Sequence, residues 1–511
     1  MTMSVGRRVV LGGAAAALAS ARLRRAKAEA PKQGGVLRVS AYGDITSFDP
    51  ATGRSGEDHV QLYPLYDTLI DYDFPTLTAR PRLATAWNFV DPKTLVLDLR
   101  PAVLFHDGTA CDAAAVKYNL DRVRSYPRSN IKADVDAIDT VETRGAQQVV
   151  LHLKRPDTAL PLVLSDRAGM MVSPTAFEKY GEAFDRNPVG AGAMRFVEWR
   201  DKDRTVYARN DKYWQPGRPY LDGIRFALIS DLQTGLRSVM TGENDFIYAL
   251  TPQQMMLARR ARDLVTSASP TLFCQLLFFN YGRGLMADAR VRQAINYAID
   301  RKAFDQASAL DLYQVAEMLL PKEHWAYDAA LAVRYPHDPV RARALLAEAG
   351  HRDGITLDLM AYNDQASQQR AEILIEQMKA GGITLRMKSG ALPEITGQFF
   401  SGKIGDMLLA AWTGRPDPSL SYALMFGKNG YFNPGGAEMP GLEDALAATR
   451  VSEALDVRKA AFATVQKIVI DDALCAPLLF QAQLVAHNAK VQGWQPTLLG
   501  KPRFDDVFLS G

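Results

Sequence analysis

The sequence predicts an α/β protein built from more than one lobe. In the first half, apolar and polar residues alternate over short segments, which is the period of a half-buried strand. The second half alternates helical and strand patterns, the order that produces a mostly parallel sheet. At 511 residues the chain exceeds the roughly 250 to 300 residues at which a single core stops growing. We therefore expect two or three lobes.

Six segments of the first half are predicted to be β-strands, because apolar residues recur in them at every second position. Each is short enough to be one strand of a sheet with a single buried face. The segments are residues 36–39, 95–99, 149–153, 195–197, 206–208 and 224–228.

The second half contains a strand, helix, strand series. Asp338 suits a helix N-cap and Pro339 the first turn, while Gly350 and Gly381 suit the ends of two helices. Such a series forms a βαβ unit, in which the two strands lie parallel. The predicted elements are a helix beginning at Asp338, a helix over 365–380, strands over 355–361 and 383–387, and a buried strand over 404–411.

The N-terminal 30 residues are predicted to be an export signal. Arg7 and Arg8 precede an apolar run over 9–21, which is shorter than the roughly 20 residues that a membrane span needs. The paired arginines resemble a twin-arginine signal, with an ordinary secretory signal as the alternative. Small residues suit cleavage after Ala28 or Ala30, and no cysteine stands there for lipid attachment. We expect a protein released into the periplasm of a Gram-negative bacterium.

Charge and cysteine content exclude several partners. The formal charge of +3 comes from the signal, because residues 1–30 carry six Lys or Arg and one acid, and the remainder has −2. No basic surface for nucleic acid is therefore predicted. Cys111, Cys274 and Cys475 are widely spaced, without a Cys-x-x-Cys pair, and no histidine spacing fits zinc. We expect neither a metal site nor a cofactor.

Two loops that follow predicted strands are candidate parts of a binding site, since ligands of open α/β sheets bind beyond the carboxyl ends of strands. One covers residues 44–50 and includes Thr46. The other places Trp412, Arg415 and Asp417 within six residues, between turn-forming Gly and Pro. An aromatic ring, a guanidinium and a carboxylate together suit a zwitterion. The alternative is a rigid surface turn in which Arg415 and Asp417 pair in solvent.

An ordered series of motifs over nearly the whole mature chain resembles the extracytoplasmic solute-binding proteins of family 5, which serve peptide, nickel and opine importers. The segment over 99–109, followed by the one over 116–122, is the most specific. The motifs are GGVLRV at 34–39, LYDTL at 65–69, PRLATAW at 81–87, LRPAVLFHDGT at 99–109, VKYNLDR at 116–122, NPVGAG at 187–192, RNDKYW at 209–214 and RVRQAINYAIDR at 290–301.

The resemblance implies a type II periplasmic-binding-protein-like fold with an additional inserted domain. Lobe I would comprise residues 31–65, 188–275 and 486–511, the inserted lobe II residues 66–187, and lobe III residues 276–485. Chain crossings near 275–280 and 482–486 would form the hinge. The protein would close its lobes on a solute as a monomer and deliver it to the membrane permease subunits of an ABC importer.

The same resemblance directs attention to three further residues. Arg167 matches a cleft-facing position of the inserted lobe, where a guanidinium could hold a ligand carboxylate, although a structural ion pair with Asp166 or with a neighbouring lobe is an equal alternative. His59 lies near the mouth of the cleft by the same comparison. Tyr431 would either line the pocket or pack beneath the 412–418 loop.

These features predict a binding protein that captures a small carboxylate-bearing organic solute, such as a peptide or a modified peptide. The resemblance also permits a nickel or other metal chelate, whose carboxylates Arg167 would hold. Family members that bind peptides use an aspartate after the third-lobe strand, and the arginine in the 412–418 loop argues against a simple dipeptide. A periplasmic hydrolase is the weaker alternative, because the sequence has no Gly-x-Ser-x-Gly elbow and no phosphate-binding loop.

Overall fold

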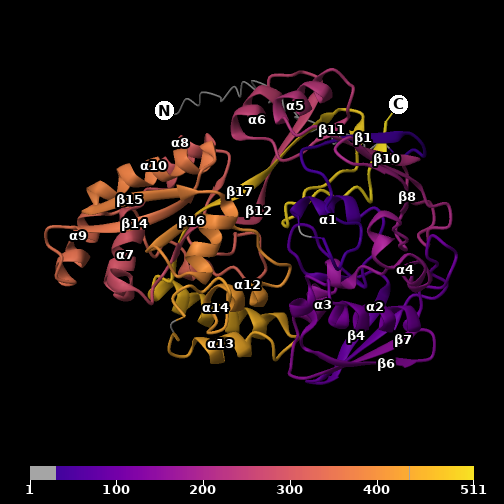
Figure 1. Cartoon of the computed structure of the whole chain (residues 1–511), viewed down its shortest axis with the longest axis horizontal. Helices are drawn as coiled ribbons and strands as arrows, with labels where there is room; N and C mark the ends of the chain where they lie inside the picture. Colours follow the sequence, from indigo (N-terminus) through magenta and orange to yellow (C-terminus); the bar gives the residue numbers. More distant parts are fainter. Residues whose placement is uncertain (1–29, 54, 437, 511) are drawn as a thin grey trace, which may run out of the picture.

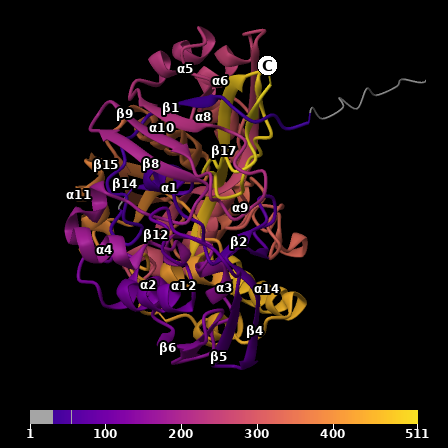
Figure 2. The same ribbon diagram turned by 90° about the vertical axis from the view of Figure 1, so that its right-hand side faces the viewer.

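The computed structural model describes residues 30–510 except 54 and 437. The predicted export signal therefore lies, apart from Ala30, outside the described residues. In Figure 1 the chain forms two bodies side by side, with β14, β15 and β16 in one and β1, β8 and β10 in the other. The four-stranded sheet and the helices α5 and α6 lie at opposite ends of the molecule (Figure 2).

The largest sheet joins the two bodies, in the order β15-β14-β16-β12-β17-β11-β1-β10-β9-β8, with β13 paired to β17. The neighbours β14 and β16 are parallel, as are β1 and its neighbours β10 and β11, so their carboxyl ends lie at common edges. The strands are β1 Val36–Ala41, β8 Met194–Arg200, β9 Arg204–Arg209, β10 Gly223–Leu228, β11 Phe246–Ile247, β12 Leu264–Phe279, β13 Gln314–Val315, β14 Ile355–Tyr362, β15 Ile383–Gly390, β16 Met407–Trp412 and β17 Cys475–Asn488.

Two long antiparallel strands, β12 and β17, cross from one body to the other (Figure 1). Their ladder runs from the Leu264–Asn488 pair to the Phe278–Cys475 pair and shifts register between Pro270 and Cys274. They are the strands that the sequence places at the predicted hinge.

A separate antiparallel sheet, in the order β4-β5-β7-β6, lies within residues 84–153. The helix α2 packs against it, capped by Asp112, whose carboxylate accepts from the amides of Ala114 and Ala115. The strands of the smaller sheets are β2 Ile70–Tyr72, β3 Ala79–Pro81, β4 Ala84–Asp91, β5 Thr94–Leu99, β6 Ile138–Arg144, β7 Gln148–Leu153, β18 Val491–Gln492 and β19 Phe508–Leu509.

The helices cover the faces of these sheets and agree with the caps expected from sequence. Asp338 caps α9, and α10 has the predicted bounds. The helices are α1 Gly56–Leu62, α2 Ala113–Ser125, α3 Leu160–Val163, α4 Pro174–Tyr180, α5 Leu232–Met240, α6 Pro252–Ala258, α7 Ala289–Ala298, α8 Arg301–Ala309, α9 Pro339–Glu348, α10 Gln365–Ala380, α11 Leu392–Thr396, α12 Pro418–Phe426, α13 Leu442–Ala448 and α14 Leu455–Asp471.

The six strands predicted in the first half and those at 355–361 and 383–387 are confirmed. The strand expected over 404–411 begins three residues later, at Met407. Lys403 and Gly405 both have positive φ, and Ile404 is 43% exposed, so this stretch is a turn and the apolar Ile404 lies outside the buried strand.

Three large hydrophobic clusters form the interior. The first contains only residues from 274 to 480. The second lies mostly within 69–171, and the third combines residues of 37–66, 170–226, 246–248 and 485–507. Segments far apart in sequence therefore share a core, and the chain leaves and re-enters the third cluster several times. No helix within the described part of the chain is both long and apolar enough to span a bilayer.

Candidate functional site

Charged side chains from three distant segments lie close enough to influence one another electrostatically. The segment over 134–167 supplies Asp134, Asp166 and Arg167, the loop after β16 supplies Arg415, and the C-terminal segment supplies Lys501. Burial raises the pKa of Asp134, against the opposing charges of Arg415, Arg167 and Lys501. We call these five residues the charge cluster. It carries three cations and two carboxylates.

Lys501 is the most perturbed cation of the charge cluster. Burial lowers its pKa to about 8, with Arg415 and Arg167 acting in the same direction and Asp166 and Asp134 opposing. Among the described residues, no carboxylate oxygen lies within 4.0 Å of its ammonium. Lys501 is thus held near two carboxylates without a direct ion pair, and at neutral pH it is mostly protonated.

Asp166 is the carboxylate of the charge cluster that has a direct partner. Its Oδ1 lies 3.0 Å from Nε2 of His59, on α1, and accepts from the amide of Arg167 at 2.9 Å. Burial, reinforced by Lys501, lowers the pKa of His59 to about 4, so the imidazole is neutral at pH 7. The alternative that Asp166 pairs with the Arg167 side chain is not what the structure shows, because the Arg167 guanidinium donates to the carbonyl of Gly53 at 2.5 Å.

Arg415 has no ion pair among the described residues. Its nearest hydrogen bond, to the carbonyl of Gly414, is long at 3.5 Å, and its Nε is buried without a partner among the described residues. The guanidinium carbon lies 5.8 Å from the centre of the Trp412 ring. Both Arg415 and Arg167, predicted to act from opposite lobes, therefore belong to one charge cluster.

Asp417 has a structural position that the sequence did not reveal. It is fully buried, caps α12 by accepting from the amide and hydroxyl of Ser419, and lies 2.7 Å from the guanidinium of Arg458. The interpretation of Arg415 and Asp417 as an ion pair in solvent is therefore wrong. Within the 412–418 loop, the single carboxylate is already engaged by the protein.

Three further residues predicted to bind ligand, Trp412, Tyr431 and Thr46, make contacts within the protein. Trp412 is buried, donates from its indole to Ser421 at 3.0 Å and packs edge-on against Phe432. Tyr431 is 51% exposed and packs on the same Phe432 ring, with centroids 4.9 Å apart. Thr46 donates from its amide and hydroxyl to Asp58 at 2.6 and 2.7 Å, which fixes the loop after β1.

Sequence reasoning missed a buried polar group at the carboxyl ends of the parallel strands β1 and β11. Tyr42 and Tyr248 directly follow these strands, and the Tyr248 hydroxyl donates to Glu57 at 2.5 Å. Burial raises the pKa of Glu57, although hydrogen bonds from both tyrosines oppose that shift. In the sequence, these tyrosines could have been recognised only by their position, because each is the first residue after a strand.

A cavity beside Arg370 was also missed. Its volume is about 80 Å³, and it lies at the carboxyl ends of β14 and β16, against the first turns of α10. By the same measure a water molecule needs about 10 to 15 Å³, so the cavity has room for a small polar group.

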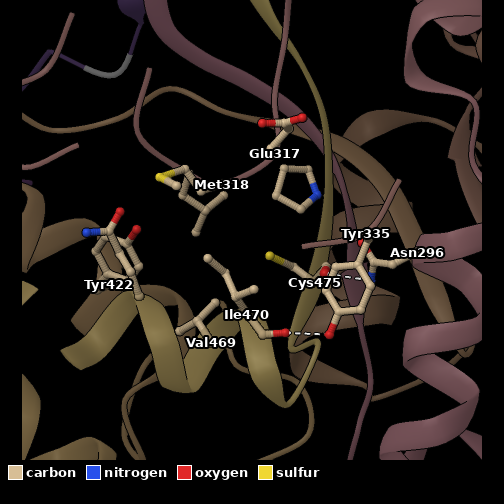
Figure 3. A pocket seen from close by; sticks show the side chains of 11 residues that line it. Asn296, Glu317, Met318, Tyr335, Tyr422, Val469, Ile470 and Cys475 are labelled. Atoms are coloured by element: carbon tan, nitrogen blue, oxygen red, sulfur yellow. Dashed lines mark hydrogen bonds between the residues drawn. The ribbon is translucent and has the colours of Figure 1, made fainter. Parts of the chain in front are cut away.

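A second cavity lies inside the first hydrophobic cluster (Figure 3). Its volume is about 10 Å³, no more than one water molecule occupies. Two of its polar side chains bond to the backbone, since Tyr335 donates to the carbonyl of Ile470 at 2.6 Å and Asn296 donates to that of Cys475 at 3.2 Å. Oε1 of Gln466, which also lines the cavity, is buried without a partner among the described residues. Burial raises the pKa of the Cys475 thiol to about 12, which makes it unreactive. This cavity is a packing defect.

Among the described residues, no group of three or more His, Cys, Asp or Glu side chains is arranged to hold a metal ion. All three cysteines are buried and free.

Comparison with known proteins finds relatives among solute-binding proteins. Its sequence is 30% identical to the glutathione-binding protein GsiB of Pectobacterium atrosepticum over 356 residues, 68% of each chain. It is 28% identical to GsiB of Escherichia coli K12 over 477 residues, which cover 89% of this chain and 91% of the relative.

Solved structures share the fold at lower identity. The substrate-binding protein CtaP of Listeria monocytogenes superimposes with a TM-score of 0.85 at 20% identity, over 94% of this chain and all of that one. The periplasmic binding protein DppA of Helicobacter pylori, solved with the peptide STSA, gives 0.78 at 21% identity over 94% and 99%. The type II periplasmic-binding-protein-like fold is thereby confirmed. Because the profile of the bacterial extracellular solute-binding proteins, family 5, matches residues 78–433, the chain belongs to that family.

Proposed function

We propose that this protein is the periplasmic substrate-binding component of an ABC importer and captures a small organic solute that carries carboxylates, such as a peptide or a modified peptide. The observation that carries the proposal is the charge cluster, in which Arg167, Arg415 and Lys501 converge from distant segments. Its three cations exceed its two carboxylates, so a solute carboxylate would meet a net positive field.

The geometry favours an anionic group over an ammonium at this place. Guanidinium groups bind carboxylates through two parallel hydrogen bonds, and such charge-assisted bonds are about twice as strong as neutral ones. The one acid of the 412–418 loop, Asp417, is buried against Arg458 and cannot meet an ammonium. The loop therefore presents a cation where a peptide's amino terminus would need an acid.

The relatives agree with this chemistry. Two of them are named glutathione-binding proteins, and glutathione is a modified tripeptide with two carboxylates. Families of solute-binding proteins bind and deliver ligands rather than transform them, which supports a non-enzymatic role here.

We further propose the three-lobe arrangement, with lobe I over 31–65, 188–275 and 486–511, lobe II over 66–187 and lobe III over 276–485. The first two hydrophobic clusters support it, since they lie mostly within lobe III and lobe II, as does the crossing of β12 and β17. The third cluster packs residues 170–184 of lobe II against lobe I. The proposed lobes II and III touch at Arg450, whose backbone carbonyl accepts a hydrogen bond from the amide of Thr158 and whose guanidinium pairs with Asp157 at 3.4 Å. Closure needs a solute that binds both lobes at once. A solute with equal affinity for the open and closed forms would not shift the equilibrium between them.

The test is calorimetric titration of the purified mature protein with reduced glutathione, with di- and tripeptides and with their C-terminal amides. Native mass spectrometry identifies any solute that co-purifies. We expect binding of at least one free acid and much weaker binding of its amide. Preference for the amide, or for an uncharged solute, would reject the carboxylate role. Recovery of a nickel complex would establish the metal-chelate alternative, and turnover products would establish a hydrolase. A single monomeric species on sizing is also expected.

A further inference from the structure

The contact between the segment before α3 and the segment after α13 links the chain on both sides of the charge cluster. Asp157 and Thr158 precede α3, and the same stretch continues to Asp166 and Arg167 of the charge cluster. Arg450 follows α13. The amide of Thr158 donates to the Arg450 carbonyl at 3.0 Å, and the Arg450 guanidinium lies 3.4 Å from the Asp157 carboxylate. We call Asp157, Thr158 and Arg450 the latch.

On the side of lobe III, the latch is connected to the loop that carries Arg415. The residue before Arg450, Thr449, is fully buried, and its carbonyl accepts a hydrogen bond from Nε of Arg458 at 3.0 Å. Another nitrogen of the same guanidinium donates to Asp417 at 2.7 Å. Asp417 lies two residues after Arg415 in the sequence. A displacement of the latch would therefore move the group that anchors this loop.

On the side of lobe II, the latch lies at the edge of the second hydrophobic cluster. Leu160, Val163 and Leu164, which follow the latch residues in sequence, belong to that cluster. Leu420, on α12 of the proposed lobe III, packs against the same cluster. Apolar packing and the latch thus cross the boundary between the two lobes together, and the lobes contact each other here through their own side chains and backbone.

The latch is weaker than the ion pair that joins lobes I and II. In that pair Arg122 donates twice to Asp49, at 2.7 and 2.9 Å, and both side chains are less than a tenth exposed. The latch pair has one contact, at 3.4 Å, and the Arg450 side chain is 16% exposed. Burial, reinforced by Asp417, raises the pKa of Asp157 despite the opposing charge of Arg450. Such a pair can break and re-form as lobes move, whereas breaking a buried bidentate pair is far more costly.

We infer that the latch is a positioning device, which keeps Arg167 and Arg415 close together by favouring the closed arrangement of lobes II and III before a solute binds. A solute that meets both cations completes the shift. It binds more tightly because of the latch, since apparent affinity is proportional to the fraction of molecules already in the binding form. The movement of one lobe against the other rests on the proposed function. The contacts that make up the latch do not.

The test measures the distance between the lobes in protein shown by native mass spectrometry to carry no solute. Spin labels are attached at Val90→Cys on β4 and Leu455→Cys on α14, which are 60% and 47% exposed in the parent chain. Both elements lie at the ends of the two bodies away from α5 and α6 (Figure 1). The native cysteines are buried, so labelling is directed to the introduced ones. Double electron–electron resonance then gives the distribution of distances.

The latch variants are Arg450→Ala, Asp157→Asn, their combination and the conservative Arg450→Lys. Asn at position 157 retains an oxygen to accept from the amide of Ala159, so the chain before α3 keeps its hydrogen bond. Arg334→Ala is the matched control, because Arg334 pairs with Asp471 at 3.3 Å within lobe III. All variants are first compared with the labelled parent by their melting curves.

We expect a short and a long distance in the labelled parent. Arg450→Ala and Asp157→Asn should each lower the ratio of the short to the long population by roughly fivefold, the upper end of the range for ion pairs at protein surfaces. The combined variant should shift the ratio no further than either single one, because both remove the same pair. Arg450→Lys should restore most of the ratio, and Arg334→Ala should leave it unchanged.

If the parent shows only the long distance, or if both single latch variants keep its ratio within about twofold, the latch is wrong. A shifted distribution in a protein that binds neither glutathione nor any peptide would leave the latch standing and reject the proposed function. Binding of those solutes with an unshifted distribution would do the reverse.

Discussion

Two groups of buried charge share the C-terminal segment over 501–505, and they are built in opposite ways. Around Arg82 and Arg503, the guanidinium groups are fully paired: Arg82 reaches Asp67, Asp71 and Asp505 within 3.0 Å, and Arg503 reaches Asp71 and Asp505 within 3.0 Å. Both arginines are less than a tenth exposed. In the charge cluster, by contrast, the side chains of Arg167 and Arg415 bond among the described residues to backbone carbonyls alone.

The difference distinguishes a structural ion network from a candidate binding site. We call the network of Arg82 and Arg503 with Asp67, Asp71 and Asp505 the clamp, and the charge cluster the receptive site. Paired buried charges fix one arrangement of the segments that carry them, because removing either partner leaves the other uncompensated. Half-buried cations that have no carboxylate partner keep hydrogen-bonding capacity for a ligand. Close pairing with carboxylates therefore indicates a stabilising role, and cations without such pairing indicate where a solute anion is expected.

The largest expected effect tests the clamp. Arg82→Ala should lower the free energy of unfolding by about 3 to 5 kcal/mol, since it leaves Asp67, Asp71 and Asp505 buried without this partner. Chemical denaturation monitored by fluorescence measures the loss. Arg80→Ala is the control, because Arg80 is 59% exposed and pairs with Asp73 at the surface, where about 0 to 1 kcal/mol is expected. Equal losses in the two variants would contradict the distinction.

A comparable loss is expected at Asp417. Asp417→Ala removes the cap of α12 and leaves Arg458 buried and unpaired, which should destabilise the protein by about 3 to 5 kcal/mol. Arg415→Ala, two residues away, should change stability by less than 1 kcal/mol, because Arg415 has no ion pair to lose. A stable Asp417→Ala variant with weakened solute binding would return Asp417 to the role of ligand.

The receptive site is tested by affinity. Arg167→Ala and Arg415→Ala should each weaken binding of a carboxylate-bearing solute by roughly thirty-fold or more, since losing one partner of a buried charged contact costs about 2 to 5 kcal/mol. Calorimetric titration of folded variants measures the change. Trp412→Ala should also weaken binding, because its ring supports the loop. A value within threefold of wild type for Arg167→Ala would make that side chain structural.

The smallest effect concerns pH. Lys501 has a pKa of about 8, so its positive charge is present below pH 8 and lost above it. A bound carboxylate favours the charged form and raises that pKa, so affinity should fall on the order of tenfold between pH 7 and pH 9. Lys501→Met should bind more weakly at pH 7 and lose this dependence. An affinity that is constant from pH 7 to pH 9 in wild type would place Lys501 outside the site.

Stability should respond to Lys501 with the opposite sign. Its folded pKa lies below its usual value, so between pH 8 and about 10.5 the unfolded chain binds more protons than the folded chain. This group alone therefore makes the folded state more stable as pH rises through that window. Comparing the pH dependence of unfolding in wild type and Lys501→Met isolates the contribution.

Local patterns in the sequence predicted much of the fold. Alternating residues located β5 and β7, and the cap at Asp338 and the periodic face over 365–380 located α9 and α10, because both signals depend on neighbours within one element. The start of β16 was missed because an apolar residue, Ile404, lies in a turn. Hydrophobicity alone does not distinguish a strand from the turn that precedes it.

The site was harder to predict, because its members are joined only by tertiary contacts. Arg415 was predicted from its loop and Arg167 from the family resemblance, whereas Lys501 and Asp134 lie in segments with no motif and approach the others only through the fold. Asp417 was given a ligand role because its partner, Arg458, lies 41 residues away and on another helix. The Arg370 cavity depends on strand register, which no local pattern contains.

The segment over 501–505 takes part in both charge groups. Arg503 and Asp505 pair with the clamp residues over 67–82, and Lys501 belongs to the charge cluster with residues over 134–167. A substitution that displaces this short segment would therefore disturb the ion network and the charge cluster together, so stability and solute binding would be lost in the same variant.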